Sequence, residues 1–459
     1  MLSRRVVRAC ILVAAALWAT LVGGACASVG SPKGPVPSPN VLLIYADDLG
    51  YGELGCYGQT KIATPHLDAL AARGQRYTRA YTGAPVCAPA RCMLLTGRAA
   101  GSAQVRDNVE LQPEGQKPLA AGTPNLARSL QAAGYATGLY GKWGLGPVGS
   151  SGDPNAQGFD QFYGYACQRH AHSHTPEWLW RNQTREPLPP GTYAPDRFRD
   201  EALAFLRTRG ERPFFVMYAT TIPHMAMQVP EDSLAQYAGT FPETPYTGGR
   251  GYTPHPTPRA AYAAMITRLD RDVGILLAEL ERRGELDRTI VMVTSDNGPT
   301  HDVGGVDTEF FASSGGLRGR KGSVYEGGLR VPLLVAGPGI APAVSDRHIA
   351  GWDLANALLD LCGVPQLAGE GESFAPTLRG VAQPPRSPIG WDFPGYGGQR
   401  AVLMGDWKAI QRGLAKNPNA PWELYNLATD PAEARDVAAA HPERLAEVRR
   451  LAGVDTLAP

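Results

Sequence analysis

The chain of 459 residues has little net charge, because 44 lysines and arginines offset 43 aspartates and glutamates to leave a formal +1. No global basic field therefore attracts nucleic acid, and any anion has to be recognised by local residues. Internal repeats are absent, and no apolar run after the first 27 residues is long enough to span a bilayer. With 43% hydrophobic and 19% charged residues, the composition excludes collagen, coiled coil and wholesale disorder, and it fits a soluble globular protein.

Cysteines that could pair are also scarce. Seven are present, and Cys10 and Cys26 lie within the first 27 residues, which leaves five. These five contain no CxxC pair and their number is odd. The sequence therefore indicates neither a disulfide framework nor a zinc cage.

Residues 1–27 have the pattern of an export signal, in which three arginines and no acid precede a short apolar run that ends in small residues. We therefore expect a bacterial protein exported to the periplasm or the cell exterior, with 28–39 as a flexible Pro/Gly/Ser tether. Two alternatives stay open. One is a twin-arginine signal at Arg4-Arg5, and the other is a lipid anchor on Cys26, which would place the protein at a membrane.

Strands and helices alternate along most of the chain. Apolar runs without polar alternation predict buried strands at 41–45, 136–140, 214–219, 289–294 and 331–336. Amphipathic stretches predict helices at 65–73, 125–133, 195–209, 258–283 and 353–362, the first two opened by Thr64-Pro65 and Thr123-Pro124. This alternation predicts an α/β domain over 40–383.

The pattern changes after about Gln383. A hairpin is predicted at 401–404 and 408–411, a further strand at 422–427, and a helical stretch from Pro431 to the end. We interpret 384–459 as a small C-terminal α+β domain with a short antiparallel sheet.

Polar residues follow several of the predicted strands, where ligands bind in open α/β sheets. They are Asp47, Asp48, Lys142, His224, Asp296 and Asn297. The adjacent carboxylates of Asp47 and Asp48 would repel each other unless a cation lay between them. Hard oxygen donors favour Ca²⁺ or Mg²⁺ over zinc. A simpler alternative is that one of the two aspartates caps the following turn.

The string Cys87-Ala88-Pro89-Ala90-Arg91, followed by Thr96-Gly97-Arg98, resembles the sulfatase signature CxPxR…TGR. Further motifs of the type I sulfatases follow in order over most of 40–430. They are similar to Asp47-Asp48-Leu49-Gly50, Gly141-Lys142-Trp143, Pro223-His224, Ser295-Asp296-Asn297-Gly298, Gly319-Arg320-Lys321-Gly322 with Glu326-Gly327-Gly328, and Trp422–Leu427 with Asp430-Pro431. The family is arylsulfatase-like and belongs to the alkaline-phosphatase-like superfamily, whose fold is a large mixed, mostly parallel sheet flanked by helices.

The resemblance implies a chemistry as well as a fold. A formylglycine-generating enzyme would oxidise Cys87 to formylglycine (3-oxoalanine), whose hydrate attacks sulfur to give a formylglycine–sulfate intermediate. The second hydroxyl then expels sulfate. The expected activity is hydrolysis of organic sulfate monoesters of aryl or carbohydrate alcohols. An unmodified, buried Cys87 thiol is the alternative.

The resemblance also implies a role for each site residue. Asp47, Asp48, Asp296 and Asn297 would hold one divalent cation beside Cys87, Ca²⁺ or alternatively Mg²⁺. Arg91 would hydrogen-bond the formylglycine. Lys142 and Lys321 would bind sulfate oxygens, and His224 would be a general acid that also contacts the substrate.

One position departs from the family pattern. Many sulfatases have His in the string GKWHLG, and Gly144 stands there in this chain. The segment 168–174 carries His170, His172 and His174, which would point the same way on a strand. We hypothesise that His170 or His172 enters the vacant place, with His172 favoured, and we expect His174 to be exposed.

Two other functions stay open at this point. One is a phosphate or phosphonate ester hydrolase of the same superfamily, and the other is an inactive homologue that binds sulfated glycans. Loops 167–180 and 225–258 carry aromatic residues that suit sugar or aryl stacking, although packing explains any single one of them.

Overall fold

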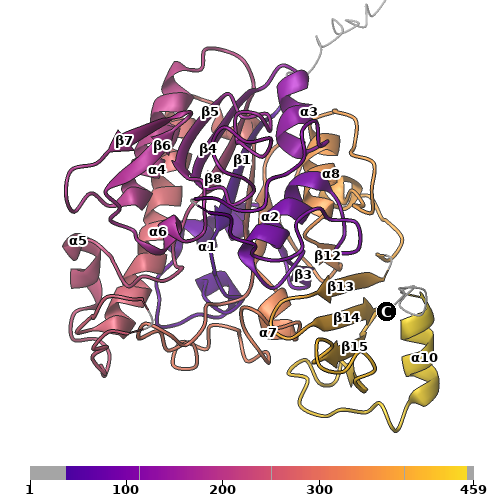
Figure 1. Cartoon of the computed structure of the whole chain (residues 1–459). Helices are drawn as coiled ribbons and strands as arrows, with labels where there is room; N and C mark the ends of the chain where they lie inside the picture. The colour runs from indigo at the N-terminus through magenta and orange to yellow at the C-terminus, as the bar shows by residue number, and fades with distance from the viewer. Residues whose placement is uncertain (1–37, 113, 250, 387, 452–459) are drawn as a thin grey trace, which may run out of the picture. The chain divides into compact units, whose positions relative to one another are not determined.

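The computed structural model describes residues 38–112, 114–249, 251–386 and 388–451, through which a ten-stranded sheet runs (Figure 1). Its strand order is β11-β2-β10-β9-β1-β8-β4-β5-β6-β7. The strands are β1 (Asn40–Ala46), β2 (Gln75–Tyr77), β4 (Ala136–Lys142), β5 (Gln161–Tyr165), β6 (Trp178–Arg181), β7 (Thr184–Pro187), β8 (Phe214–Ala219), β9 (Thr289–Ser295), β10 (Leu333–Ala336) and β11 (Ala343–Ser345). The predicted signal and most of the tether lie outside the described residues.

The centre of this sheet is parallel. β1 pairs in parallel with β8 and β9, and β4 pairs in parallel with β8 and β5. Antiparallel strands follow on both sides, with β10 against β9 and with β6 between β5 and β7. The sheet is therefore mixed and mostly parallel, as expected.

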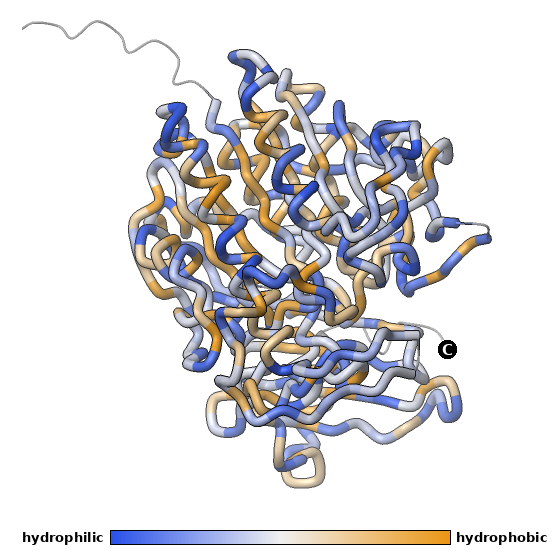
Figure 2. Tube along the Cα trace, turned by 90° about the vertical axis from the view of Figure 1, so that its left-hand side faces the viewer, coloured by the Kyte–Doolittle hydropathy of each residue, from blue (hydrophilic) through white to orange (hydrophobic). Residues whose placement is uncertain are grey.

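Helices cover both faces of the sheet, α2, α3 and α8 on one and α1, α4 and α6 on the other. The α-helices of this part of the chain are α1 (Pro65–Arg73), α2 (Cys87–Thr96), α3 (Leu126–Ala132), α4 (Ala194–Thr208), α5 (Glu231–Leu234), α6 (Pro258–Arg282), α7 (Glu326–Leu329), α8 (Asp353–Leu361) and α9 (Ala375–Leu378). Successive side chains of β1 point to opposite faces. Val41 and Leu43 pack with α2, α3 and α8, whereas Leu42 and Ile44 pack with α1, α4 and α6. Both faces of β1 are thus buried, which explains why its sequence is apolar without alternation (Figure 2).

A four-stranded antiparallel sheet follows toward the C-terminus, in the order β13-β14-β15-β16 (Figure 1). Its strands are β13 (Ile389–Phe393), β14 (Gln399–Met404), β15 (Trp407–Arg412) and β16 (Trp422–Asn426), and α10 (Pro442–Leu451) packs on it through Val448. The predicted hairpin and third strand are confirmed. A two-stranded sheet joins β3 (Ala80–Tyr81) to β12 (Ile349–Ala350). Four short 3-10 helices, η1 (Gly55–Tyr57), η2 (His170–His172), η3 (Ala235–Tyr237) and η4 (Leu286–Arg288), also lie within the described part of the chain.

The predicted start of α1 is confirmed, with Thr64 at the N-cap and Pro65 as the first residue, although the Asp270 carboxylate of α6 and not the Thr64 side chain accepts from the first-turn amides. Two other local predictions were wrong. Helix α3 is capped by Asn125, whose side chain accepts from Arg128 N, so Thr123-Pro124 precede the helix. Strand β10 begins at Leu333 because Pro332 has no amide hydrogen for the ladder.

The predicted helix from Pro431 onward is also wrong for its first turns, because α10 starts at Pro442. Asp430 accepts from Ala434 N and Arg435 N, and Asp436 accepts from Ala438 N. Such short-range carboxylate bonds favour turns over helix. In the described ranges no helix is long and apolar enough to cross a membrane.

Candidate active site

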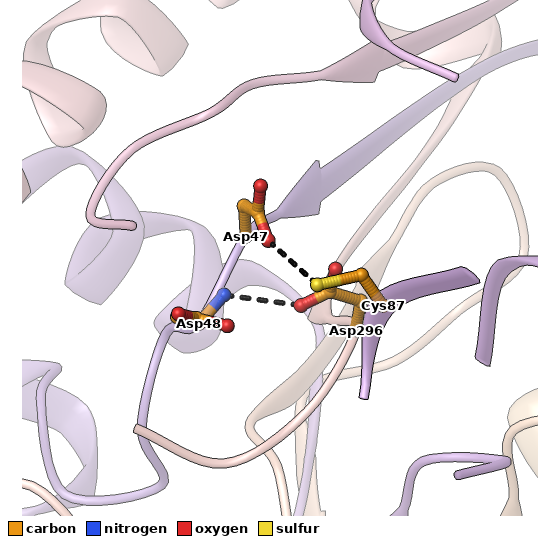
Figure 3. A group of neighbouring side chains, drawn as sticks. All are labelled: Asp47, Asp48, Cys87 and Asp296. Atoms are coloured by element: carbon orange, nitrogen blue, oxygen red, sulfur yellow. Dashed lines mark hydrogen bonds between the residues drawn. The ribbon is translucent and has the colours of Figure 1, made fainter. Parts of the chain in front are cut away.

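The acidic residues meet because β1 and β9 are neighbours in register. Ala46 pairs with Ser295, so Asp47 and Asp296 each come directly after the last paired residue of a parallel strand. Asp48 N donates to Asp296 Oδ1 over 3.0 Å, and all three carboxylates are fully buried (Figure 3). The positions predicted from strand ends are thus brought together at one edge of the sheet.

Cys87 and Arg91 reach the same place from α2. Cys87 is the first residue of this helix and is 1% exposed, and its Sγ lies 3.5 Å from Asp47 Oδ1 (Figure 3). Arg91 is one turn later on the same face. Its guanidinium donates to Asp296 Oδ2 over 2.7 Å and to the Lys142 carbonyl over 2.8 Å.

Burial determines the pKa of the Cys87 thiol. It raises the thiol pKa to about 12, above the ordinary value of 9.0, although Lys142 and Lys321 oppose the shift. An unmodified thiol here stays protonated at neutral pH and is a weak nucleophile.

The residues present suit a hard cation. One ligand atom from each of Asp47, Asp48, Cys87 and Asp296 can be chosen so that all four lie within 4.8 Å of one another. Asn297 donates through Nδ2 to Asp48 Oδ1, whereas its Oδ1 is buried and has no partner among the described residues. A buried carbonyl oxygen beside three carboxylates is the donor set that Ca²⁺ and Mg²⁺ take. Burial and the Asp47 charge raise the pKa of Asp296 above its ordinary value, which is a repulsion that a bound cation would relieve.

Two lysines balance the acids. Lys142 Nζ lies 2.7 Å from Asp47 Oδ2, and Lys321 Nζ lies 2.7 Å from Asp48 Oδ1. Burial alone would raise the pKa of Asp47, but Lys142 and the other cationic groups nearby together outweigh it and hold that pKa well below its ordinary range. Burial likewise would lower the pKa of Lys321, and Asp48 together with the other acidic groups nearby reverses the shift. Both lysines are therefore charged.

His224 lies beside the cluster, with Nε2 at 3.7 Å from Asp48 Oδ2. Its Nδ1 faces the Met225 carbonyl, and its own carbonyl meets His174 Nε2 at 2.9 Å. Burial, followed by the Lys321 charge, lowers the pKa of His224 to about 3. Without a bound anion the imidazole is neutral, with its proton on the nitrogen that faces a carbonyl.

The histidine segment differs from the prediction. His170 and His172 belong to η2, so they do not share one face of a strand. His170 packs on Tyr165 and Trp178 and does not reach the acidic cluster. His172 stacks on His224 with ring centroids 4.9 Å apart and stands at the site.

The expectation that His174 is exposed was wrong. Its side chain is fully buried, with Nδ1 at 3.0 Å from the Thr221 hydroxyl. It fixes the loop that carries His224, and sequence reasoning missed this role.

The place beside Gly144 is filled by Gln168 rather than by a histidine. A Cβ built on Gly144 would lie 2.3 Å from Gln168 Nε2, and the next side chain to it is Arg91, at 3.9 Å. Parallel pairing of β4 with β5 brings these loops together, since Gly144 N donates to Ala166 O just after both strands. Nothing in the spacing of the sequence identified Gln168.

Comparison with known proteins identifies the family. A family model described as Sulfatase matches residues 39–364. The chain belongs to the sulfatase family. Human arylsulfatase A is 32% identical over 467 residues, which cover 90% of this chain and 87% of the human protein. The N-acetylgalactosamine-6-O-sulfatase of Bacteroides thetaiotaomicron is 29% identical, with 90% of this chain and 92% of that protein covered.

Solved structures share the fold of this chain. The crystal structure of Ps i-CgsB in complex with k-i-k-neocarrahexaose has a TM-score of 0.75 and 26% identity, and covers 90% of this chain and 91% of that one. A phosphonate monoester hydrolase of Agrobacterium radiobacter, at 21% identity and a TM-score of 0.64, shares the fold. The sulfatase is therefore a sulfuric ester hydrolase, as the CAPAR signature predicted.

Proposed function

We propose that this sulfatase hydrolyses sulfate monoesters of aryl or carbohydrate alcohols, with Cys87 matured to formylglycine and one Ca²⁺ beside it. The observation that carries the proposal is the charge balance around residue 87. Three buried carboxylates are each paired with a buried cation, Asp47 with Lys142, Asp48 with Lys321 and Asp296 with Arg91. These six charges cancel, so a dication adds an excess of positive charge that favours an anionic ester.

The matured side chain and the cation supply the nucleophile. A hydrated aldehyde at position 87 offers one hydroxyl to attack sulfur and a second to release sulfate, and the cation would lower the pKa of the hydroxyl. Asp47, Asp48, Asp296 and Asn297 would hold the cation.

The other residues bind the anion and orient the reacting groups. Lys142 and Lys321 would exchange part of their contact with Asp47 and Asp48 for sulfate oxygens. Arg91 holds Asp296 and the backbone at the end of β4, so it fixes α2 relative to the sheet. His224 faces Asp48 through Nε2 and would serve the leaving oxygen once a bound anion favours its protonated form.

Aromatic rings near Lys321 support an aryl or sugar substrate. Tyr252 stacks on His172 at 6.1 Å, and Tyr396 stacks on His301 at 5.6 Å. Lys321 lowers the pKa of both tyrosines against the rise that burial causes, so both rings lie within reach of its charge. Tyr396 is 60% exposed and free to contact a ring of the substrate.

Maturation and location belong to the same proposal. A formylglycine-generating enzyme would modify Cys87 before folding, and residues 1–27 would direct export to the periplasm or the cell exterior. Cys26 as a lipid anchor is the alternative to release. His170 has no part in the proposed chemistry, whereas His172 stacks on His224, the proposed acid for the leaving oxygen.

The test is direct. The chain is expressed with a formylglycine-generating enzyme, the peptide around Cys87 is analysed by mass spectrometry, and hydrolysis of an aryl sulfate and of a panel of sulfated sugars is measured. Cys87→Ala should abolish turnover, and the control Cys92→Ala, in the same buried helix, should retain it. A matured protein that hydrolyses none of these esters would refute the proposal, and equal turnover by Cys87→Ala would refute the role of Cys87.

A further inference from the structure

Gln168 is a buried amide without a hydrogen-bond partner in the described chain. It lies between β5 and η2, is 7% exposed, and both Oε1 and Nε2 are buried and unsatisfied. A buried polar group without a partner costs free energy, so two such atoms in one side chain indicate a ligand that bonds them.

The surroundings of Gln168 place that ligand at the active site. Its Nε2 lies over Gly144, which directly follows Lys142 and Trp143, and Arg91 is the next side chain to the same spot. Arg91 Nε is also buried and has no partner in the described ranges, although the two terminal nitrogens of the guanidinium are bonded. Three unsatisfied polar atoms, two of Gln168 and one of Arg91, therefore belong to side chains that meet at Gly144, and Arg91 is on the helix that begins at Cys87.

The hydrogen-bonding chemistry of the amide restricts which group can bind it. Nε2 can only donate and Oε1 can only accept. A sulfate oxygen can only accept and would leave Oε1 unsatisfied, whereas a hydroxyl group both donates and accepts. Hydration of a formylglycine at position 87 would supply such hydroxyl groups at the start of α2, the helix that also carries Arg91.

We infer that Gln168 is a positioning residue that orients the hydrated formylglycine at position 87 through its neutral amide, in the space that the missing side chain of Gly144 leaves open. This inference rests on the proposed function. Because an amide does not titrate, Gln168 orients a hydroxyl but takes no proton. Proton transfer therefore falls to other groups.

The first test needs no turnover. Wild type and Gln168→Met are each produced with and without the formylglycine-generating enzyme, and the melting temperatures of the matured and unmatured forms are compared. Maturation should raise the melting temperature of the wild type, and this gain should shrink in Gln168→Met. Gln116→Met is the control, because Gln116 is buried and has one unpartnered amide oxygen but belongs to the Glu110–Gln116 bridge.

The second test uses kinetics on an aryl sulfate. Gln168→Met should lower kcat about tenfold with KM little changed, as expected for a lost hydrogen bond that orients the nucleophile. Gln168→Glu retains the shape and adds an ionisation, so it should introduce a new limb in the pH profile of kcat. If Gln168→Met folds poorly, the pH profile of Gln168→Glu tests the inference in its place.

Equal maturation gains in wild type and Gln168→Met would overturn the inference, as would a rise in KM alone, which would mean that Gln168 contacts the substrate. The proposed function fails separately, if the matured wild type shows no turnover.

Discussion

Arg91 and Asp296 form a fully buried ion pair with 2.7 Å between Nη2 and Oδ2, and the pair joins α2, one turn after Cys87, to the residue that follows β9. Neither group is accessible to water, since Arg91 is 1% and Asp296 0% exposed. The pair therefore positions Cys87 against the carboxylates that follow β1 and β9. Breaking it leaves a buried charge without its partner.

Arg91→Ala should consequently lower the free energy of unfolding by about 3–5 kcal/mol, the range for a broken buried pair. Urea unfolding followed by circular dichroism measures it. Arg379→Ala, which removes a half-exposed partner of Asp360, is the matched control and should change little. A loss no larger than that of the control would show that the pair contributes nothing to stability.

The unpartnered oxygen of Asn297 leads to a prediction on metal binding. Adding Ca²⁺ at about a hundredfold over its dissociation constant should stabilise the protein by about 2.7 kcal/mol, seen as a rise in melting temperature. Asn297→Ala removes one oxygen donor and should reduce this rise. Asn417→Ala, on an exposed turn, should retain it. The same rise in all three proteins would place the ion elsewhere.

The strand ends of the site could be predicted from the sequence because β1, β8 and β9 are apolar throughout, and such strands are buried on both faces. The pairing of Asp47 with Asp296 follows from that pattern once the two strands are neighbours. Short strands escaped prediction. β2 has only three residues, and β13 alternates Ile389, Trp391 and Phe393 with polar or small residues in a segment dense in proline and glycine.

The residue beside Gly144 could not be predicted, because it depends on how two loops fold after β4 and β5. The sequence predicted three histidines on a strand, yet the segment forms the 3-10 helix η2. With the segment folded as η2, His172 lies at the site and His174 is buried against the His224 carbonyl. Gln168, just before η2, occupies the space near Gly144. These placements are set by tertiary contacts, which periodicity does not encode.

Gly144 has a φ of +78°, and a Cβ there would lie 2.3 Å from Gln168 Nε2. Gly144→Ala should therefore destabilise the fold both by backbone strain and by this collision. Gly149→Ala is a matched control for strain alone, since Gly149 has a φ of +82° and open space around it.

Thermal unfolding should show a larger loss for Gly144→Ala than for Gly149→Ala. The double variant Gly144→Ala with Gln168→Gly should recover part of the difference, because the colliding amide is gone. Additive losses in the double variant would contradict the placement of Gln168.

The last prediction concerns pH and lies away from the site, at Asp272 of α6. Burial raises the pKa of this carboxyl to about 6, above the ordinary 3.8, although Arg199 at 2.9 Å opposes the shift. Between about pH 4 and 6 the folded protein therefore retains a proton that the unfolded chain has lost. The contribution of Asp272 to stability is consequently largest below this window and falls as the pH rises through it.

Asp272→Asn removes that dependence. On going from pH 7 to pH 4.5 the variant should lose about 1–2 kcal/mol more stability than the wild type, because only the wild type gains from proton uptake at this carboxyl. Urea unfolding at the two pH values measures the difference. Asp287→Asn, whose side chain is fully exposed, should change in parallel with the wild type. If Asp272→Asn also follows the wild type, the Asp272 carboxyl has the same pKa in the folded and the unfolded protein, and its burial contributes no pH dependence to stability.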